Sequence, residues 1–255
     1  MKAVVLLLVS MISACCYAND ISTIRFGVDP TYPPFESKDR SGTLVGFEID
    51  LGNEICARLH AKCVWIENDF DGMIPGLKAR KFDAIMSGMT ITDQRAEQIS
   101  FSDKLWNSSL RLLAKKGSTV LPTPEALRGK SVGVQQGTIA ETYAKRHWAP
   151  EGATVVPYQN QNLVYEDLAV GRLDAVLIGD IQAQLGFLGT PRGVSHGFVG
   201  DKIVDPFSLK GNAIGFRKED GHLKQRVNQA ISDLRRDGTY ERIEKKYFAF
   251  DVYGD

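Results

Sequence analysis

The stretch Lys81-Phe82-Asp83-Ala84-Ile85-Met86 recurs in altered form as Arg172-Leu173-Asp174-Ala175-Val176-Leu177. Each copy follows a helix-like segment and ends two residues ahead of a glycine, Gly88 in the first case and Gly179 in the second. A unit that occurs twice in this way predicts two lobes built from similar strands and helices.

Apolar strand candidates alternate with helical patterns along the whole chain, at 24–28, 63–67, 84–87, 131–134, 154–158, 174–178 and 213–216. Alternation of this kind predicts α/β lobes with largely parallel sheets. In such sheets ligands bind at the carboxyl ends of the strands, where helices start. The segments that follow the first, third and fourth of these strands are therefore the expected binding site.

The chain is expected to cross between the lobes twice. Leu110-Arg111-Leu112-Leu113-Ala114 has the pattern of an extended crossing into the second lobe, and the chain returns around 206–212. Two crossings form a two-strand hinge, which allows the lobes to close on a ligand. We expect a signal peptide at 1–18, a first lobe at 19–108 and 213–255, and a second lobe at 109–212.

Residues 1–18, MKAVVLLLVSMISACCYA, have the features of a secretory signal peptide: Lys2, an apolar core, and small residues before a polar segment. Cleavage after Ala18 would start the mature chain at Asn19. The alternative is a lipoprotein cleavage box that ends at Cys15, which would leave a lipidated cysteine as the first residue.

Two cysteines, Cys56 and Cys63, remain beyond the signal segment. In an exported protein a lone pair is most simply a disulfide. A metal site is not expected, because only His60 lies near the two thiols and a fourth ligand is missing. No cofactor motif is found either.

Lysine plus arginine and aspartate plus glutamate number 31 each, so the formal net charge is zero. A neutral chain has no overall field to recruit nucleic acid or anionic lipid. The partner is therefore expected to be a small molecule recognised in a site.

Arg95 is the main candidate for binding that molecule. It follows a strand that ends in the small and hydroxyl residues Ser87, Gly88 and Thr90. A guanidinium binds a carboxylate through two parallel charge-assisted hydrogen bonds, a geometry that lysine cannot match. The alternative is an arginine on a solvated helix face.

The first strand ends in Asp29-Pro30-Thr31-Tyr32-Pro33-Pro34-Phe35, a loop stiffened by prolines. Tyr32 is expected to stack on a ligand, whereas Phe35 is expected to pack in the core. Phe70 is a second candidate aromatic wall. Two aromatic faces near Asp29 favour a flat or cationic side chain.

In the second lobe, Val132-Gly133-Val134-Gln135-Gln136-Gly137-Thr138 passes from a strand through a glycine turn into a helix that begins near Thr138. The backbone N–H groups at such a helix start can receive a carboxylate oxygen. Gln135 and Ile139 flank this turn. A purely structural turn explains the glycines equally well.

Together these segments resemble the periplasmic amino-acid-binding proteins of ABC importers, most of all the lysine/arginine/ornithine- and histidine-binding group. The resemblance covers nearly the whole mature chain and is carried by 29–32, 46–51, 70–75, 87–95, 132–138, 171–175, 237–240, 247–248 and 250–254. It implies a two-lobed periplasmic-binding-protein fold of type II, with a cleft that traps one amino acid for a membrane permease.

By resemblance, Arg95 and N–H groups near Thr138 would hold the ligand α-carboxylate. The α-ammonium would lie among Ser87, Gly88 and Thr90. Tyr32 and Phe70 would enclose the side chain, with Asp29 facing its distal charge. The resemblance therefore favours arginine, lysine, ornithine or histidine, bound by a monomeric periplasmic protein.

The chain departs from the family pattern in three places. Gly179 stands where the family has an aspartate that pairs with the α-ammonium, and Asp180 comes one residue later. Gly88 replaces a more usual serine, and Ile139-Ala140 replaces polar residues near the carboxylate. The ligand could therefore be an opine or another N-substituted arginine derivative.

Two other functional classes are compatible with the sequence. The same fold hosts a dehydratase acting on a cyclic carboxylate, for which Asp29, Glu36 and Asp180 are the candidate acids, but none has an evident histidine or carboxylate partner. A sensor ligand-binding domain is the third class. We expect a binding protein and no enzyme.

Overall fold

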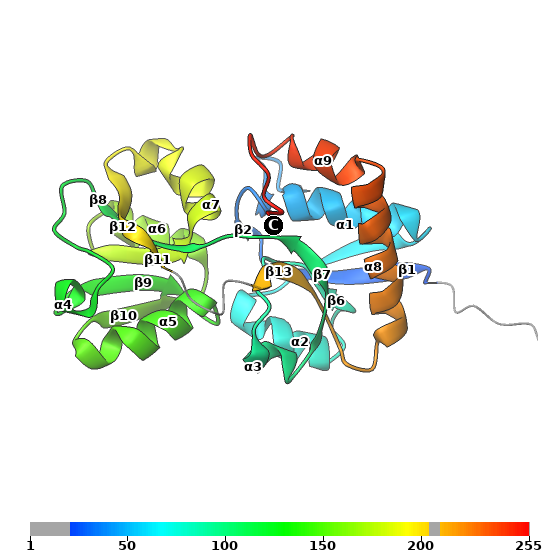
Figure 1. The fold of residues 1–255 in the computed structure, drawn as a ribbon, viewed down its shortest axis with the longest axis horizontal. Coiled ribbons are helices and arrows are strands. Elements are labelled where there is room, and N and C mark those ends of the chain that lie inside the picture. Colours follow the sequence, from blue (N-terminus) through cyan, green and yellow to red (C-terminus); the bar gives the residue numbers. More distant parts are fainter. Residues whose placement is uncertain (1–20, 204–209, 255) are drawn as a thin grey trace, which may run out of the picture.

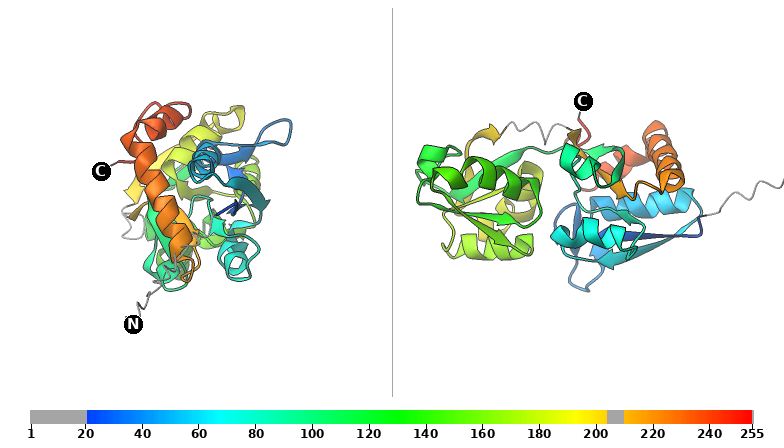
Figure 2. Two further views of the ribbon diagram at one scale, coloured as in Figure 1. Left: turned by 90° about the vertical axis from the view of Figure 1, so that its right-hand side faces the viewer. Right: turned by 90° about the horizontal axis from the view of Figure 1, so that it is seen from below.

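The computed structural model describes residues 21–203 and 210–254. Within them two α/β lobes lie side by side along the long axis of the molecule, each built around a five-stranded sheet (Figures 1 and 2). The two-lobed α/β architecture predicted from the sequence is confirmed. The predicted signal peptide, with Cys15, lies outside the described residues.

The sheet of the first lobe has the order β5-β1-β6-β13-β7. Its strands are β5 (Lys62–Glu67), β1 (Thr23–Val28), β6 (Ala84–Ile85), β13 (Asn212–Phe216) and β7 (Ser100–Trp106). A small three-stranded sheet follows β1 and consists of β2 (Thr31–Tyr32), β3 (Glu36–Lys38) and β4 (Leu44–Val45).

Helices cover both faces of this sheet. One group packs together against β1 and β7 and consists of α1 (Phe47–Arg58), α8 (Gly221–Arg236) and α9 (Thr239–Glu244). The other face carries the 3₁₀ turn η1 (Phe70–Gly72) and α2 (Met73–Lys78), which packs on β1 and β6. The short helix α3 (Asp93–Ala96) follows β6.

The sheet of the second lobe has the order β10-β9-β11-β8-β12. Its strands are β10 (Thr154–Tyr158), β9 (Ser131–Gln135), β11 (Ala175–Gly179), β8 (Leu110–Lys115) and β12 (His196–Ile203). Its helical segments are α4 (Pro124–Leu127), α5 (Ile139–His147), η2 (Ala149–Glu151), α6 (Gln161–Ala169), α7 (Asp180–Gln182), η3 (Ala183–Leu188) and η4 (Pro191–Gly193). Helices α5 and α6 contribute to separate core clusters.

Each sheet is mixed, whereas the sequence predicted largely parallel sheets. Strand β13 runs antiparallel to β6 and β7, and β8 runs antiparallel to β11 and β12. The antiparallel strands β8 and β13 each start at the edge of their sheet where the parallel strands end. They must therefore run in the opposite direction. The segment 110–114, predicted as a crossing, is a strand within the second sheet.

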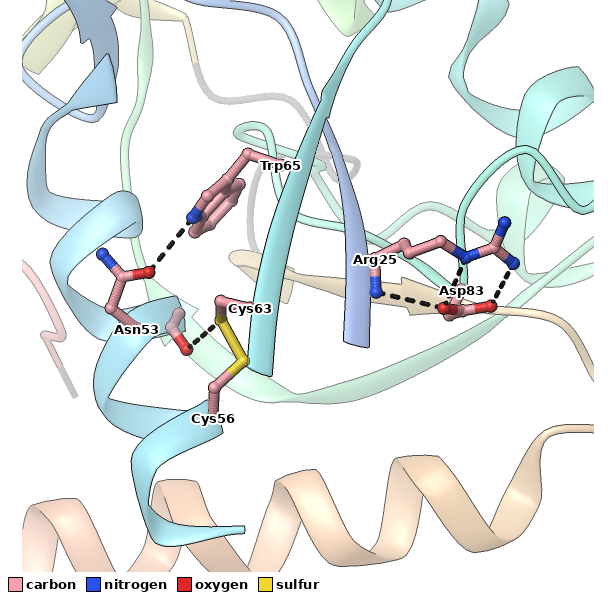
Figure 3. The surroundings of a disulfide bond; sticks show 7 residues. Arg25, Asn53, Cys56, Cys63, Trp65 and Asp83 are labelled. Atoms are coloured by element: carbon pink, nitrogen blue, oxygen red, sulfur yellow. Dashed lines mark hydrogen bonds and ion pairs between the residues drawn. A yellow bond between two sulfur atoms is a disulfide. The ribbon is translucent and has the colours of Figure 1, made fainter. Parts of the chain in front are cut away.

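The repeated Asp-Ala pair has the same structural role in both lobes. The Asp83 carboxylate accepts a 3.0 Å hydrogen bond from the backbone N–H of Arg25, and Asp174 accepts one of 2.8 Å from Ser131 (Figure 3 shows the first). Each aspartate thus ties the start of its own strand to the start of the neighbouring parallel strand. The lobe boundaries given above remain a prediction.

Cys56 in α1 and Cys63 in β5 form the predicted disulfide, with their Cα atoms 5.7 Å apart (Figure 3). Beside it the indole of Trp65 donates a 3.1 Å hydrogen bond to the side chain of Asn53. The disulfide joins the helix to the edge strand at one side of the first lobe. Neither cysteine lines the cavity described below.

Reduction of this disulfide is expected to lower the free energy of unfolding by about 2.5 kcal/mol, because the bond restricts a short loop in the unfolded chain. In a chain of this size the melting temperature should fall by about 5 to 10 °C. Thermal denaturation with and without reductant measures the effect, and the double variant C56S/C63S should reproduce it. An unchanged melting temperature would contradict the expectation.

Candidate functional site

A cavity lies between the lobes, near the edge where β1, β6, β9 and β11 end. It encloses about 660 Å³ of empty space, part of it continuous with solvent. Most of the predicted ligand-binding residues line it: Asp29, Tyr32, Phe70, Ser87, Gly88, Thr90, Gln135, Thr138, Ile139 and Gly179. Arg95 and Asp180 lie outside this lining.

The lobes are in direct contact across the cavity. Gln135 of the second lobe donates a 2.7 Å hydrogen bond to the carboxylate of Asp29 in the first. Further along the same edge, Gln159 donates one of 2.7 Å to Asp69. The structure therefore has the two lobes closed on one another.

Asp29 follows β1 directly, and its carboxylate is buried, with 4% of the residue exposed. One carboxylate oxygen accepts from the Thr31 hydroxyl at 2.9 Å, and the other accepts from Gln135. Burial raises the pKa of Asp29 to about 6. A cation bound beside this carboxylate would favour its ionised form.

Arg95 lies in α3, which begins after Thr92, whose hydroxyl accepts the Arg95 backbone N–H. The guanidinium donates to the carbonyl oxygens of Thr90 at 2.8 Å and of Gly137 in the second lobe at 2.9 Å. It stands 5.4 Å from the centre of the Phe70 ring. Burial lowers the pKa of Arg95 to about 10, so it is a cation at neutral pH.

Arg95 lines a hollow that adjoins the cavity. Gly137 and Ile139 line this hollow as well, and Ile139 also lines the cavity. Ile139 thus lies between the cavity and the hollow that Arg95 lines. Its two observed acceptors are neutral carbonyls, which a carboxylate would outcompete because charge-assisted hydrogen bonds are stronger.

The second-lobe turn opens into α5 where the sequence predicted a helix start. Thr138 is the N-terminal cap, with its hydroxyl accepting from Glu141 N–H at 3.2 Å and donating to the Gln135 carbonyl at 2.7 Å. Thr138, Ile139 and Ala140 all line the cavity. The first turn of α5, with the partial positive charge of a helix start, therefore forms part of the cavity wall.

Tyr32 reaches across the cavity to Gly179. A Cβ atom at position 179 would lie 2.7 Å from the Tyr32 hydroxyl oxygen and 2.8 Å from the Ser108 hydroxyl oxygen. The Tyr32 ring stacks on Phe35, which is buried as predicted and stacks on Trp106 with ring centres 3.7 Å apart. The space that a side chain at position 179 would need is thus occupied by two hydroxyl groups.

The variant Gly179→Ala is expected to bind ligand about 5-fold to 100-fold more weakly, because its methyl group overlaps the Tyr32 hydroxyl when the lobes close. Titration calorimetry with the ligand found in the thermal-shift screen proposed below measures the change. Gly221→Ala is the matched control, since a Cβ atom there meets open space. Equal affinities of Gly179→Ala and wild type would show that the closed contact is not needed.

Asp180 does not line the cavity. Its carboxylate accepts from the backbone N–H groups of Ser109 at 3.2 Å and Ile181 at 2.8 Å, and forms an ion pair with Lys202 at 3.0 Å. The residue opens α7, which places its side chain along the inter-lobe segment. The geometry therefore does not support Asp180 as a ligand-binding residue in this conformation.

Two further acids are buried beside the cavity. Glu48 accepts from the Trp106 indole at 2.6 Å and from the Gly88 N–H at 3.0 Å, and burial raises its pKa to about 7. Glu36 accepts from the Ser87 hydroxyl at 3.2 Å. Burial, followed by the nearby charges of Glu48 and Asp29, raises the pKa of Glu36 well above its usual value.

Sequence reasoning named Glu36 only as a candidate catalytic acid and did not find Trp106, Ser108 or Asn212, which also line the cavity. These three lie where the chain crosses between the lobes. Among the described residues no group of three or more histidine, cysteine, aspartate or glutamate side chains is placed to hold a metal ion. None of the helices in 21–203 and 210–254 is long and apolar enough to cross a membrane.

The family model for bacterial extracellular solute-binding proteins, family 3, matches residues 24–250. The lysine/arginine/ornithine-binding periplasmic protein of Escherichia coli (strain K12) is 50% identical over 244 residues, which cover 95% of this chain and 94% of that protein. The histidine-binding periplasmic protein of the same strain is 47% identical over the same shares. The L-arginine-binding protein of Pseudomonas aeruginosa is 41% identical over 97% of this chain and 96% of its own.

Solved structures of amino-acid-binding proteins are also similar to this chain. An ancestral arginine-binding protein bound to arginine has a TM-score of 0.84 and 35% identity, over 90% of this chain and all of that one. An ancestral amino-acid-binding protein described as a precursor of cyclohexadienyl dehydratase has a TM-score of 0.79 and 31% identity, over 89% of this chain and 96% of its own.

Proposed function

Because the chain belongs to the bacterial extracellular solute-binding proteins of family 3, we propose that it captures a cationic amino acid between its lobes and delivers it to the permease of an ABC importer. The ligands we propose are arginine, lysine, ornithine or histidine. The relatives support this choice, because they are named as binding proteins for these amino acids.

The observation that carries the proposal is the position of Asp29. It is a buried acid on the cavity wall, near Phe70 and in contact with Gln135 of the opposite lobe. A cationic side chain bound there would offset the cost of burying the carboxylate and contact both lobes. Only a ligand that interacts better with the closed state can shift the protein toward closure.

The other residues take roles that fit this ligand. Arg95 and the first turn of α5 receive the α-carboxylate, with Thr90 beside it. Tyr32 and Phe70 enclose the aliphatic part of the side chain. We further propose that the protein is an exported periplasmic monomer, in line with the periplasmic relatives.

A second ligand class is favoured by one observation. No carboxylate of the second lobe lines the cavity within the described residues. The nitrogen of an opine or N-substituted arginine derivative carries fewer N–H donors than a primary ammonium, so it depends less on an acid there. Catalysis has no comparable support, and the dehydratase and sensor readings remain lesser alternatives.

A thermal-shift screen of the refolded, ligand-stripped mature protein tests the proposal. The panel contains the common amino acids, ornithine, octopine and nopaline, and calorimetry follows each response. Ligand at 100 times its dissociation constant should stabilise the protein by about 2.7 kcal/mol, or about 5 to 10 °C. Responses to cationic amino acids would support the main proposal, and responses to opines alone would replace it with the second. No response to any of them would refute both.

A further inference from the structure

We propose that Glu36 of the first lobe is the counter-ion for the ligand ammonium group, in place of an acid from the second lobe. This inference rests on the function proposed above and assigns a specificity-determining residue to the same site. The observation that supports it is a buried carboxylate on the wall of the cavity, one oxygen of which has no hydrogen-bond partner in the described part of the chain.

Glu36 stands at the start of β3, with 1% of the residue exposed, and it lines the cavity. Its Oε1 accepts from the Ser87 hydroxyl at 3.2 Å. Its Oε2 is buried and has no hydrogen-bond partner among the described residues. Buried polar atoms are rarely left unpaired, so an unpaired one on a cavity wall indicates a donor supplied by the ligand.

The other acids near the cavity already have partners for their carboxylate oxygens. Glu48 is held by Trp106 and Gly88, and does not line the cavity. Asp29 accepts from Thr31 and Gln135. Asp29 and Glu36 are the acids that line the cavity in the described part of the chain, and of these two, only Glu36 has an oxygen with no hydrogen-bond partner at all.

The surroundings of Glu36 suit an ammonium group. A Cβ atom on Gly88 would lie 3.7 Å from Glu36 Oε1 and 3.6 Å from the Tyr32 ring, so the glycine leaves space between the carboxylate and the aromatic face. An ammonium has three donors, and a nearby aromatic face stabilises it further. Thr90 donates its hydroxyl proton to Asn212 at 2.8 Å, so its oxygen can accept from the ligand.

Charge balance points in the same direction. Glu36, Glu48 and Asp29 form a group of buried acids whose pKa values are all raised, chiefly by burial. Among the described residues, the hydrogen bond to Glu36 comes from the Ser87 hydroxyl and not from a cationic side chain. A ligand cation placed against Glu36 would stabilise its ionised form and reduce the repulsion among the three acids.

The test uses calorimetry of the full mature protein with two probes, L-arginine and 5-guanidinopentanoic acid, which is arginine without its α-ammonium. Glu36→Gln keeps the shape of the side chain and removes its charge. It should weaken arginine binding about 30-fold or more and leave binding of the analogue within about 3-fold of wild type. Glu67→Gln is the matched control, since Glu67 is an exposed glutamate of the same lobe that pairs with Lys38.

Two more variants make the test decisive. Glu36→Asp keeps the charge and should retain part of the preference for arginine, which covers the case that Glu36→Gln folds poorly. Asp180→Asn tests the competing counter-ion. The proposal is overturned if Glu36→Gln binds arginine as wild type does, if it weakens both probes equally, or if Asp180→Asn alone loses the preference for arginine.

Failure of this inference and failure of the proposed function have different signatures. If the wild type responds to no amino acid or opine in the thermal-shift screen, the function is wrong and Glu36 has no ammonium to pair with. If the wild type prefers arginine to 5-guanidinopentanoic acid and Glu36→Gln keeps that preference, the function stands and only the role of Glu36 is refuted.

Discussion

Arg95→Ala is expected to bind the amino-acid ligand at least about 100-fold more weakly than the wild type, while the protein still folds. The guanidinium is buried and donates to two carbonyl oxygens, one in each lobe. A ligand carboxylate in their place would form charge-assisted, two-point hydrogen bonds, and removing one partner of such a buried pair costs about 2 to 5 kcal/mol. Calorimetry with the ligand identified by thermal shift measures the loss.

Arg95→Lys separates charge from geometry. It keeps the cation but not the planar fork, so we expect it to recover only part of the affinity. Arg80→Ala is the control for a lost arginine, because Arg80 is exposed and pairs with Glu219 on the surface. Unchanged ligand affinity in Arg95→Ala, with a normal thermal transition, would refute the central assignment of the site.

Much of the fold could be predicted from the sequence because its repeated elements have local causes. Asp83 and Asp174 each pin the start of a neighbouring strand, so the two copies keep the same short pattern. The direction of β8 and β13 could not be predicted in this way. Apolar periodicity reports which residues are buried, whereas strand direction depends on the side from which the chain enters a sheet.

Residues of the cavity wall were predictable where they come shortly after a parallel strand, as Asp29 does after β1 and Ser87 does after β6. Glu36 reaches the cavity through the β2–β3 hairpin, in which it pairs with Tyr32 while Phe35 packs on Trp106, and a local sequence pattern does not report such tertiary packing. Asp180, which the sequence predicted as a ligand-binding residue, does not line the cavity. It is one residue beyond Gly179, and the start of α7 at that position turns its carboxylate toward Ser109 and Lys202.

Asp29→Asn is expected to weaken binding of arginine or lysine about 30-fold or more. The variant removes the negative charge, while its amide oxygen can still accept from Gln135, so the contact between the lobes is kept. Binding of glutamine, which is neutral and similar in size, should change by less than about 3-fold. Calorimetry with both ligands distinguishes a lost charge from a damaged cavity, because damage would weaken both.

The same carboxylate makes ligand binding depend on pH. Burial raises the pKa of Asp29 to about 6 in the ligand-free protein, and a bound cation lowers that pKa by favouring the ionised form. Affinity for a cationic amino acid should therefore rise with pH through about 6 and level off above it, with a proton released on binding in that range. Glu36 and Glu48 also have raised pKa values and can contribute to the pH dependence of the affinity. The part of this pH dependence that is due to Asp29 is the part that disappears in Asp29→Asn.

The stability of the ligand-free protein depends on pH in the opposite direction from the ligand affinity. Because the pKa of Asp29 is higher in the folded state than its ordinary value of 3.8, the folded state binds more protons between about pH 4 and 6. The stabilising contribution of protonated Asp29 is therefore lost as pH rises through this window. Thermal denaturation from pH 4 to 7 should show ligand-free wild type losing stability relative to Asp29→Asn. Saturating arginine should remove this difference or reverse it, since the ligand stabilises the ionised carboxylate of the wild type and has no charge to pair with in the variant.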